Sequence, residues 1–246
     1  ALERHFARPE GPAALFGAPL GDEATGYTNS AIGLSNRPAY RYDKVHLVPF
    51  GEFIPTGFRW FTELMNIPLG DFARGTPAAP SFGVKGERVA PNICYEDLFG
   101  EELALRFADP ARAPTVLANI SNIGWFGDTV AVPQHLAISR LRSLELQRPM
   151  LRATNTGSTA VIDHQGRVVA ALPPHTAGTL DARVQGPGGV PRPRDLAHPG
   201  DVTGLHGLDD AVAQGVGQNV RRHHRRRREQ LHVVDEVAIV DERHPR

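Results

Sequence analysis

The sequence has little of several residue types. Its 246 residues include one cysteine, Cys94, and two lysines, Lys44 and Lys85, so that 25 of the 27 basic side chains are arginines. A single cysteine excludes an internal disulfide and any metal site built from several cysteines. No stretch approaches the roughly 18 unbroken apolar residues of a membrane-spanning helix. Because Lys+Arg and Asp+Glu are 27 each, the net charge gives no indication of a polyanionic partner.

Aromatic residues are missing from one end of the chain. All 11 Phe, 4 Tyr and 2 Trp precede residue 185, whereas residues 185–246 contain ten arginines and six of the 11 histidines. A segment with so little to bury is expected to be disordered. We therefore expect a folded domain over residues 1–184 and an irregular, non-homologous tail, rich in Arg, His, Gly and Pro, over residues 185–246.

The run RRHHRRRR, Arg221–Arg228, has two interpretations. One is a basic arm that binds nucleic acid or anionic lipid, and the other is a solvated, disordered tail. Nine acidic residues nearly balance the ten arginines of residues 185–246. This balance favours the solvated tail, and no nucleic-acid partner is expected.

Short runs of apolar and β-branched residues bounded by turn formers predict strands. They are Tyr27–Leu34, Tyr40–Val48, Arg88–Tyr95, Thr115–Ser121 and Ser158–Asp163. Helical patterns cover roughly Gly57–Asn66, Leu98–Phe107 and Pro133–Gln147. The turn Asp163–Arg167, DHQGR, predicts a late hairpin with the strand Val168–Leu172. Strands that alternate with helices predict an α/β layered fold.

Cys94 lies where a predicted strand meets a predicted helix. In α/β proteins such a junction is at the carboxyl edge of the sheet, where reacting groups are placed. The positive end of the following helix is expected to lower the thiol pKa, and the flanking Tyr95, Glu96 and Asp97 could orient or provide a base. The alternative is a small buried thiol that only fills the core.

Lys44 lies in the strand sequence YRYDKVHLVPFGEFIP. In a chain that uses arginine almost everywhere, a lysine inside an apolar strand suggests chemistry, because a compact ammonium can approach a developing oxyanion. Glu52, after the Pro-Phe-Gly turn, is a candidate partner for it. The alternative is a surface lysine at the end of the strand.

Other candidates are less specific. His46, which alternates with Lys44, and His135 could complete a Cys–His dyad or serve as structural histidines. Trp125 and Phe126 in SNIGWFG could line a substrate pocket or simply pack. The sequence has no GxSxG motif, no phosphate-binding loop and no cluster of metal ligands, so no cofactor or metal is expected.

Several longer strings resemble one family. The strings YDKVHLVPFGEFIP, NICYE, SNxxWFG and PQHLAISRLRSLELQRPMLRATNTGSTAVID are similar to those of apolipoprotein N-acyltransferases, a branch of the nitrilase-like carbon–nitrogen hydrolase superfamily. The resemblance runs from about Ala13 to Asp181. It implies an αββα sandwich with a Glu–Lys–Cys triad. By matched motif, Cys94 would be the nucleophile and Lys44 the oxyanion stabiliser, with Glu52, Tyr95 and Glu96 at supporting positions.

The resemblance also implies a reaction and partners. Cys94 would take a fatty acyl chain from a phospholipid as a thioester, and the N-terminal diacylglyceryl-cysteine of an apolipoprotein would receive it as an amide. The family implies the inner cell membrane, with the catalytic domain on the extracytoplasmic face. The alternative is a soluble amidase or nitrilase, which would hydrolyse its acyl-enzyme with water.

The sequence departs from the family pattern in three ways. The glutamate of the triad would precede Ala1, so we expect a fragment whose fold is incomplete at the N-terminus and which is inactive alone. The family's membrane helices are not found at either end, and attachment to the membrane would use segments outside this chain. Position 123 is Ile where the family usually has Asp in SNDxWFG, so the family's polar contacts in that loop do not carry over to this chain by resemblance.

Overall fold

A computed structural model of the chain describes residues 5–8, 11–22, 26–54, 72–155, 157–186, 230–234 and 237–241. Its strands are β1 (Ala13–Asp22), β2 (Gly26–Leu34), β3 (Tyr40–Asp43), β4 (Phe82–Val84), β5 (Glu87–Ile93), β6 (Val116–Ser121), β7 (Met150–Thr154), β8 (Ala160–Ile162), β9 (Val168–Ala171), β10 (Thr179–Ala182), β11 (Gln230–Val234) and β12 (Val237–Asp241). Its helices are α3 (Gly100–Ala104), α4 (Ala131–Leu146) and the 3-10 turns η1 (Cys94–Leu98), η2 (Leu105–Phe107) and η3 (Gly124–Phe126).

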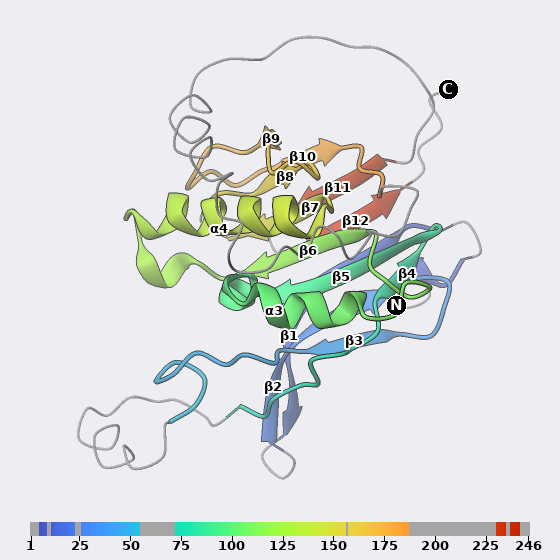
Figure 1. Cartoon of the computed structure of the whole chain (residues 1–246), viewed down its shortest axis with the longest axis horizontal. Coiled ribbons are helices and arrows are strands. Elements are labelled where there is room, and N and C mark those ends of the chain that lie inside the picture. Colours follow the sequence, from blue (N-terminus) through green and yellow to red (C-terminus); the bar gives the residue numbers. More distant parts are fainter. Residues whose placement is uncertain are drawn as a thin grey trace.

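The strands form two six-stranded sheets (Figure 1). The first has the order β10-β11-β12-β1-β2-β3 and is antiparallel throughout. The second has the order β4-β5-β6-β7-β8-β9, and its central strands β5, β6 and β7 are parallel. The α/β class expected from the sequence is confirmed.

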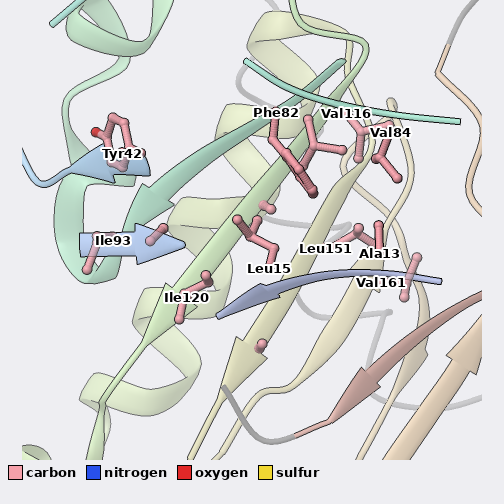
Figure 2. Close-up of a cluster of buried hydrophobic side chains, with 14 residues drawn as sticks. Ala13, Leu15, Tyr42, Phe82, Val84, Ile93, Val116, Ile120, Leu151 and Val161 are labelled. Carbon is pink, nitrogen blue, oxygen red and sulfur yellow. The ribbon is translucent and has the colours of Figure 1, made fainter. Parts of the chain in front are cut away.

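The main hydrophobic core lies between the two sheets, as Figure 2 shows. Leu15 of the first sheet packs there with Val116, Ile120 and Leu151 of the second. A second cluster joins the other face of the second sheet to α3 and α4, which lie along it (Figure 1). Every residue of β6 and β7 is buried, as expected for parallel strands that are covered on both faces.

The outer face of the first sheet also carries apolar side chains. Along β1 and β2, residues that alternate with those of the main core form a smaller cluster with Phe6, which is 8% exposed. This alternation follows from the two-residue repeat of a strand. Both faces of the first sheet are therefore apolar, as in the inner layers of a sandwich.

Several predicted elements differ in detail from the structure. The late hairpin is present as β8 and β9, and the helix predicted at Pro133–Gln147 is α4. The helix predicted over Leu98–Phe107 is instead broken, because Phe99 has φ −99° and ψ 76°, which are not helical. Strand β1 was not predicted, since its sequence AALFGAPLGD has no β-branched residue. The helix predicted over Gly57–Asn66 lies outside the described residues.

The segment after residue 184 contains two strands that the sequence did not predict. Strand β12 pairs with β1, and β11 pairs with β10, both antiparallel. Their HVV and VAIV runs have the β-branched residues that favour a sheet, and the expectation for the rest of residues 185–246 stays a prediction. Arg221–Arg228 lies outside the described residues. Among the helices of the described part of the chain, none has the length and apolar character to cross a membrane.

Candidate active site

Cys94 lies at the carboxyl end of β5, where the chain turns into η1. Its φ is +56°, a left-handed conformation that is uncommon for a residue with a side chain and costs about 1–3 kcal/mol. The residue is partly exposed. Because β5, β6 and β7 are parallel, Cys94 shares its edge of the sheet with the loops that follow Ser121 and Thr154.

Lys44 follows directly on β3 and is 1% exposed. Its Nζ donates to both carboxylate oxygens of Glu52, at 2.9 and 2.8 Å, and it lies 5.2 Å from the ring centre of Tyr95. Burial excludes the alternative of a surface lysine. The structure thus brings together Lys44, Glu52 and Tyr95, which the sequence had selected.

Two expectations about this segment are wrong. Strand β3 ends at Asp43, so Lys44 is not inside a strand and His46 does not alternate with it along one face. The physical reason is Glu96, whose carboxylate accepts the backbone N–H groups of Val45, at 2.7 Å, and His46, at 3.2 Å. These amides bond to a side chain instead of a neighbouring strand.

Glu96 is 2% exposed and also accepts the N–H of Ile93, at 2.6 Å, and the hydroxyl of Tyr42, at 3.0 Å. One carboxylate therefore ties the end of β5, and hence the Cys94 turn, to the segment that follows Lys44. Burial raises the pKa of Glu96, while these hydrogen bonds act to lower it. The resemblance placed Glu96 at a supporting position, and that role stays a prediction.

Three further bonds hold the loop between Lys44 and Glu52. Glu52 accepts the side-chain amide of Asn29, at 2.7 Å, and the backbone N–H of Val48, at 2.8 Å. The hydroxyl of Tyr95 donates to the carbonyl of Leu47, at 2.7 Å. Burial raises the pKa of Tyr95 to about 12, so the phenol keeps the proton that this bond needs.

The thiol pKa does not follow the expectation from the helix field. Burial raises the pKa of Cys94, and the Lys44 ammonium and the backbone N–H of Tyr95 only partly oppose this. The segment after Cys94 is a five-residue 3-10 helix and not a long α-helix, so its field is small. Desolvation therefore outweighs the positive groups in the free protein.

Neither histidine forms a dyad with the thiol. His46 Nδ1 lies 3.0 Å from Glu102, and its ring stacks on Phe99 with centres 3.5 Å apart. His135 Nδ1 lies 2.8 Å from Arg152, and since a guanidinium only donates, this nitrogen must accept. Nε2 therefore carries the proton, and it lies 3.1 Å from Asp97 and 3.2 Å from the backbone carbonyl of Cys94.

A buried ion pair next to Cys94 was missed from the sequence. Arg152 of β7 and Asp97 of η1 are both 0% exposed, and their closest charged atoms are 3.6 Å apart. Ser139 of α4 bridges them, since it accepts from Arg152 and donates to Asp97, each at 2.5 Å. A charged residue in the buried strand MLRAT was the one sequence feature that indicated this pair.

The loops after β6 and β7 lie at the same edge of the second sheet as Cys94. Phe126 is 54% exposed, while the side chain of Trp125 lies outside the described residues. Ile123 is buried at 1%, and its backbone N–H donates to Asn155 Oδ1 at 3.0 Å. Asn155 also donates to Asn122 at 2.7 Å. The loop therefore keeps polar contacts with the next loop although position 123 is apolar.

The family model for carbon-nitrogen hydrolase matches residues 4–188. The chain belongs to the carbon–nitrogen hydrolase family. Solved structures of this superfamily have a similar fold: an amidase from Nesterenkonia sp. has a TM-score of 0.51 at 18% identity, over 68% of this chain and 58% of that one. The C. elegans NitFhit protein has a TM-score of 0.51 at 22% identity, over 69% and 41%. The nitrilase-like sandwich expected from the sequence is confirmed.

Curated relatives within the family are more similar. An apolipoprotein N-acyltransferase of Verminephrobacter eiseniae is 62% identical over 191 residues, which cover 76% of this chain and 35% of the relative. One of Ralstonia nicotianae is 58% identical over 189 residues, which cover 76% and 36%. The chain thus spans about a third of the length of these relatives. The resemblance that the motifs indicated is confirmed.

Proposed function

We propose that this chain is the cysteine-bearing catalytic part of an apolipoprotein N-acyltransferase. One observation carries the proposal: the strained Cys94 turn lies beside a buried lysine whose charge acts on the thiol. The names of the relatives add the reaction type. The acyl donor is a phospholipid, and the acceptor is the N-terminal diacylglyceryl-cysteine of a lipoprotein.

In the first half-reaction, the Cys94 thiolate attacks the ester carbonyl of the phospholipid. A C–S bond forms, the C–O bond breaks, and the lysophospholipid leaves as an alcohol that carries a proton. The oxyanion that develops on the carbonyl needs a nearby positive group. Lys44 provides it, and its bidentate bond to Glu52 keeps the ammonium in place.

In the second half-reaction, the α-amine of the acceptor attacks the thioester. A C–N bond forms, the C–S bond breaks, and the amine proton returns to the sulfur. Both steps need an acid–base group. Both His46 and His135 are occupied by other partners, so we assign this role to the glutamate of the triad that the family resemblance implies.

The remaining site residues hold the loop in position or contact the substrate. Tyr95 and Glu96 hold the loop that follows Lys44 against the Cys94 turn. Exposed Phe126, together with Trp125, would contact the acyl chain. The names of the relatives suggest a membrane enzyme of the bacterial envelope, and we place membrane attachment in the part of the relatives' length outside this chain, with the site on the extracytoplasmic face.

A chimera tests this proposal. Residues 13–181 of this chain would replace the matching segment of the Verminephrobacter eiseniae relative, and the chimera would be supplied with phospholipid and a diacylglyceryl-cysteine peptide. We expect a hydroxylamine-sensitive acyl adduct on Cys94 by mass spectrometry, followed by an N-acylated peptide, and neither product with Cys94→Ser. Ammonia release from small amides, without peptide acylation, would instead indicate an amidase and overturn the proposal.

A further inference from the structure

The backbone carbonyl of Cys94 is held by two side chains. Asn119 Nδ2 of β6 lies 2.8 Å from this oxygen, and His135 Nε2 of α4 lies 3.2 Å from it. The peptide group is planar, so fixing the Cys94 carbonyl also fixes the direction of the Tyr95 N–H. That N–H is one of the groups that favour the Cys94 thiolate. The orientation of the Cys94 carbonyl is thus linked to the ionisation of the Cys94 thiol.

Arg152 contacts both of the side chains that hold this carbonyl. Its Nη1 lies 3.3 Å from Asn119 Oδ1, and its Nη2 lies 2.8 Å from His135 Nδ1. A guanidinium can only donate. It therefore selects the tautomer of His135 and, together with the Ser121 hydroxyl, which donates to the same Asn119 oxygen at 2.6 Å, the amide orientation of Asn119 that turns a donor toward Cys94.

We propose that Arg152 is a positioning residue for Cys94: it directs the donors of Asn119 and His135 onto the Cys94 carbonyl and so holds the strained turn. The inference rests on the proposed role of Cys94 as the nucleophile. Lysine could not replace Arg152, because one ammonium cannot reach the several acceptors that the planar fork of arginine meets.

The charge of Arg152 has a second effect on the same site. Asp97 acts to raise the pKa of Cys94, and Arg152, with Ser139 between them, compensates that carboxylate. Removing the guanidinium would leave Asp97 as an uncompensated negative charge near the thiol. The other charged groups that act on Cys94 are Lys44, which favours the thiolate, and Glu52, which opposes it.

The test is the pH dependence of Cys94 alkylation by iodoacetamide in the full 246-residue chain. Because the chain has a single cysteine, the reaction reports this residue alone. We expect Arg152→Met to move the alkylation midpoint upward by about one pH unit, which makes alkylation about tenfold slower at any pH well below the midpoint, and Arg152→Lys, which keeps the charge but not the planar fork, to move it upward by less.

Arg148 provides a matched control. It is 3% exposed and donates to the backbone carbonyls of Pro114, at 2.7 Å, and Gln147, at 2.8 Å. Arg148→Met should therefore lower the unfolding midpoint without moving the alkylation profile. A folded Arg152→Met protein that alkylates like the parent chain would overturn the proposal.

A milder variant decides the question if Arg152→Met does not fold. Ser139→Ala removes the bridge to Asp97 and leaves the guanidinium in place, and we expect alkylation about threefold slower at neutral pH. An unchanged profile in a folded Ser139→Ala protein would also overturn the proposal. Absence of phospholipid acylation in the chimera would contradict the proposed function alone, because alkylation does not depend on acyl transfer.

Discussion

Two buried ion pairs lie beside Cys94, and they differ in their surroundings. Lys44 and Glu52 belong to the loop that follows β3, and the Glu52 side chain keeps 12% exposure. Asp97 and Arg152 belong to η1 and β7, and neither has any exposure. Lys44 itself is 1% exposed, so the first pair adjoins solvent only through its carboxylate, whereas the second pair is fully enclosed. We propose that the first pair takes part in the reaction and that the second positions Cys94.

The chemistry of the two cations supports this division. Lysine is a compact point charge on a flexible stem, and it suits a developing oxyanion. Arginine donates in a fixed planar fork, and in this protein it reaches Ser139, His135, Asn119 and the carbonyl of Ser158. The predictions that follow test whether the two pairs separate activity from stability.

The largest effect on stability is expected at the enclosed pair. Asp97→Asn leaves the Arg152 guanidinium buried without its countercharge, which typically costs 3–5 kcal/mol, here about 4 kcal/mol of unfolding free energy. Urea denaturation followed by circular dichroism measures it. Asp109→Asn is the control, because Asp109 forms an exposed pair with Arg112, and its midpoint should not change. Equal midpoints for the two variants would show that the buried pair is not important for stability.

The largest effect on activity is expected at the other pair. In the chimera, Lys44→Met removes the donor to the developing oxyanion, and loss of one such donor lowers the rate about 100- to 1,000-fold. The rate of acyl-Cys94 formation measures this effect.

Lys85→Met is the matched control, because Lys85 is the other lysine and lies in the turn between β4 and β5, at the opposite end of β5 from Cys94. It should keep the parent rate. A Lys44→Met chimera that forms the acyl-enzyme at the parent rate would contradict the assignment of reaction to this pair.

The sequence predicted the first pair but not the second. Lys44, Glu52 and Cys94 lie in continuous motifs, so their types and spacing were visible. Arg152 and Asp97 are 55 residues apart in the numbering and meet only because parallel β5 and β7 end at the same edge. No local pattern contains that information.

Helix α4 contributes polar side chains to the second pair, and this contribution was also missed from the sequence. Its buried residues are Val132, His135, Ser139, Ser143 and Leu146, spaced three or four apart as on one helix face. Because three of the five are polar, the buried face does not stand out as a hydrophobic stripe. The apolar strand β6 was predicted for the opposite reason, since VLANI is apolar at nearly every position.

Tyr95→Phe should have a smaller effect on the loop that carries Lys44. It removes the hydroxyl that donates to Leu47, which costs about 1 kcal/mol, and we expect acyl-Cys94 formation in the chimera to slow about fivefold. Tyr40→Phe removes a similar bond, to the carbonyl of Pro80 at 2.7 Å, from a strand outside the loop. A comparable loss of rate in both variants would show that the effect is not specific to the loop.

The smallest effect concerns the thiol and the pH dependence of stability. Burial raises the pKa of Cys94 in the folded chain, so the unfolded chain releases this proton at lower pH. Between the unfolded and the folded pKa, the unfolded state binds fewer protons, and the free energy of unfolding therefore falls as the pH rises.

Cys94→Ser removes this dependence while other titrating groups stay the same. Urea denaturation at pH 7 and at about pH 10 should show a larger loss of unfolding free energy for the parent chain than for the variant. Equal losses for the two proteins would mean that the thiol is as easily ionised in the folded chain as in the unfolded one. The different surroundings of the two ion pairs would then have no effect on the ionisation of Cys94.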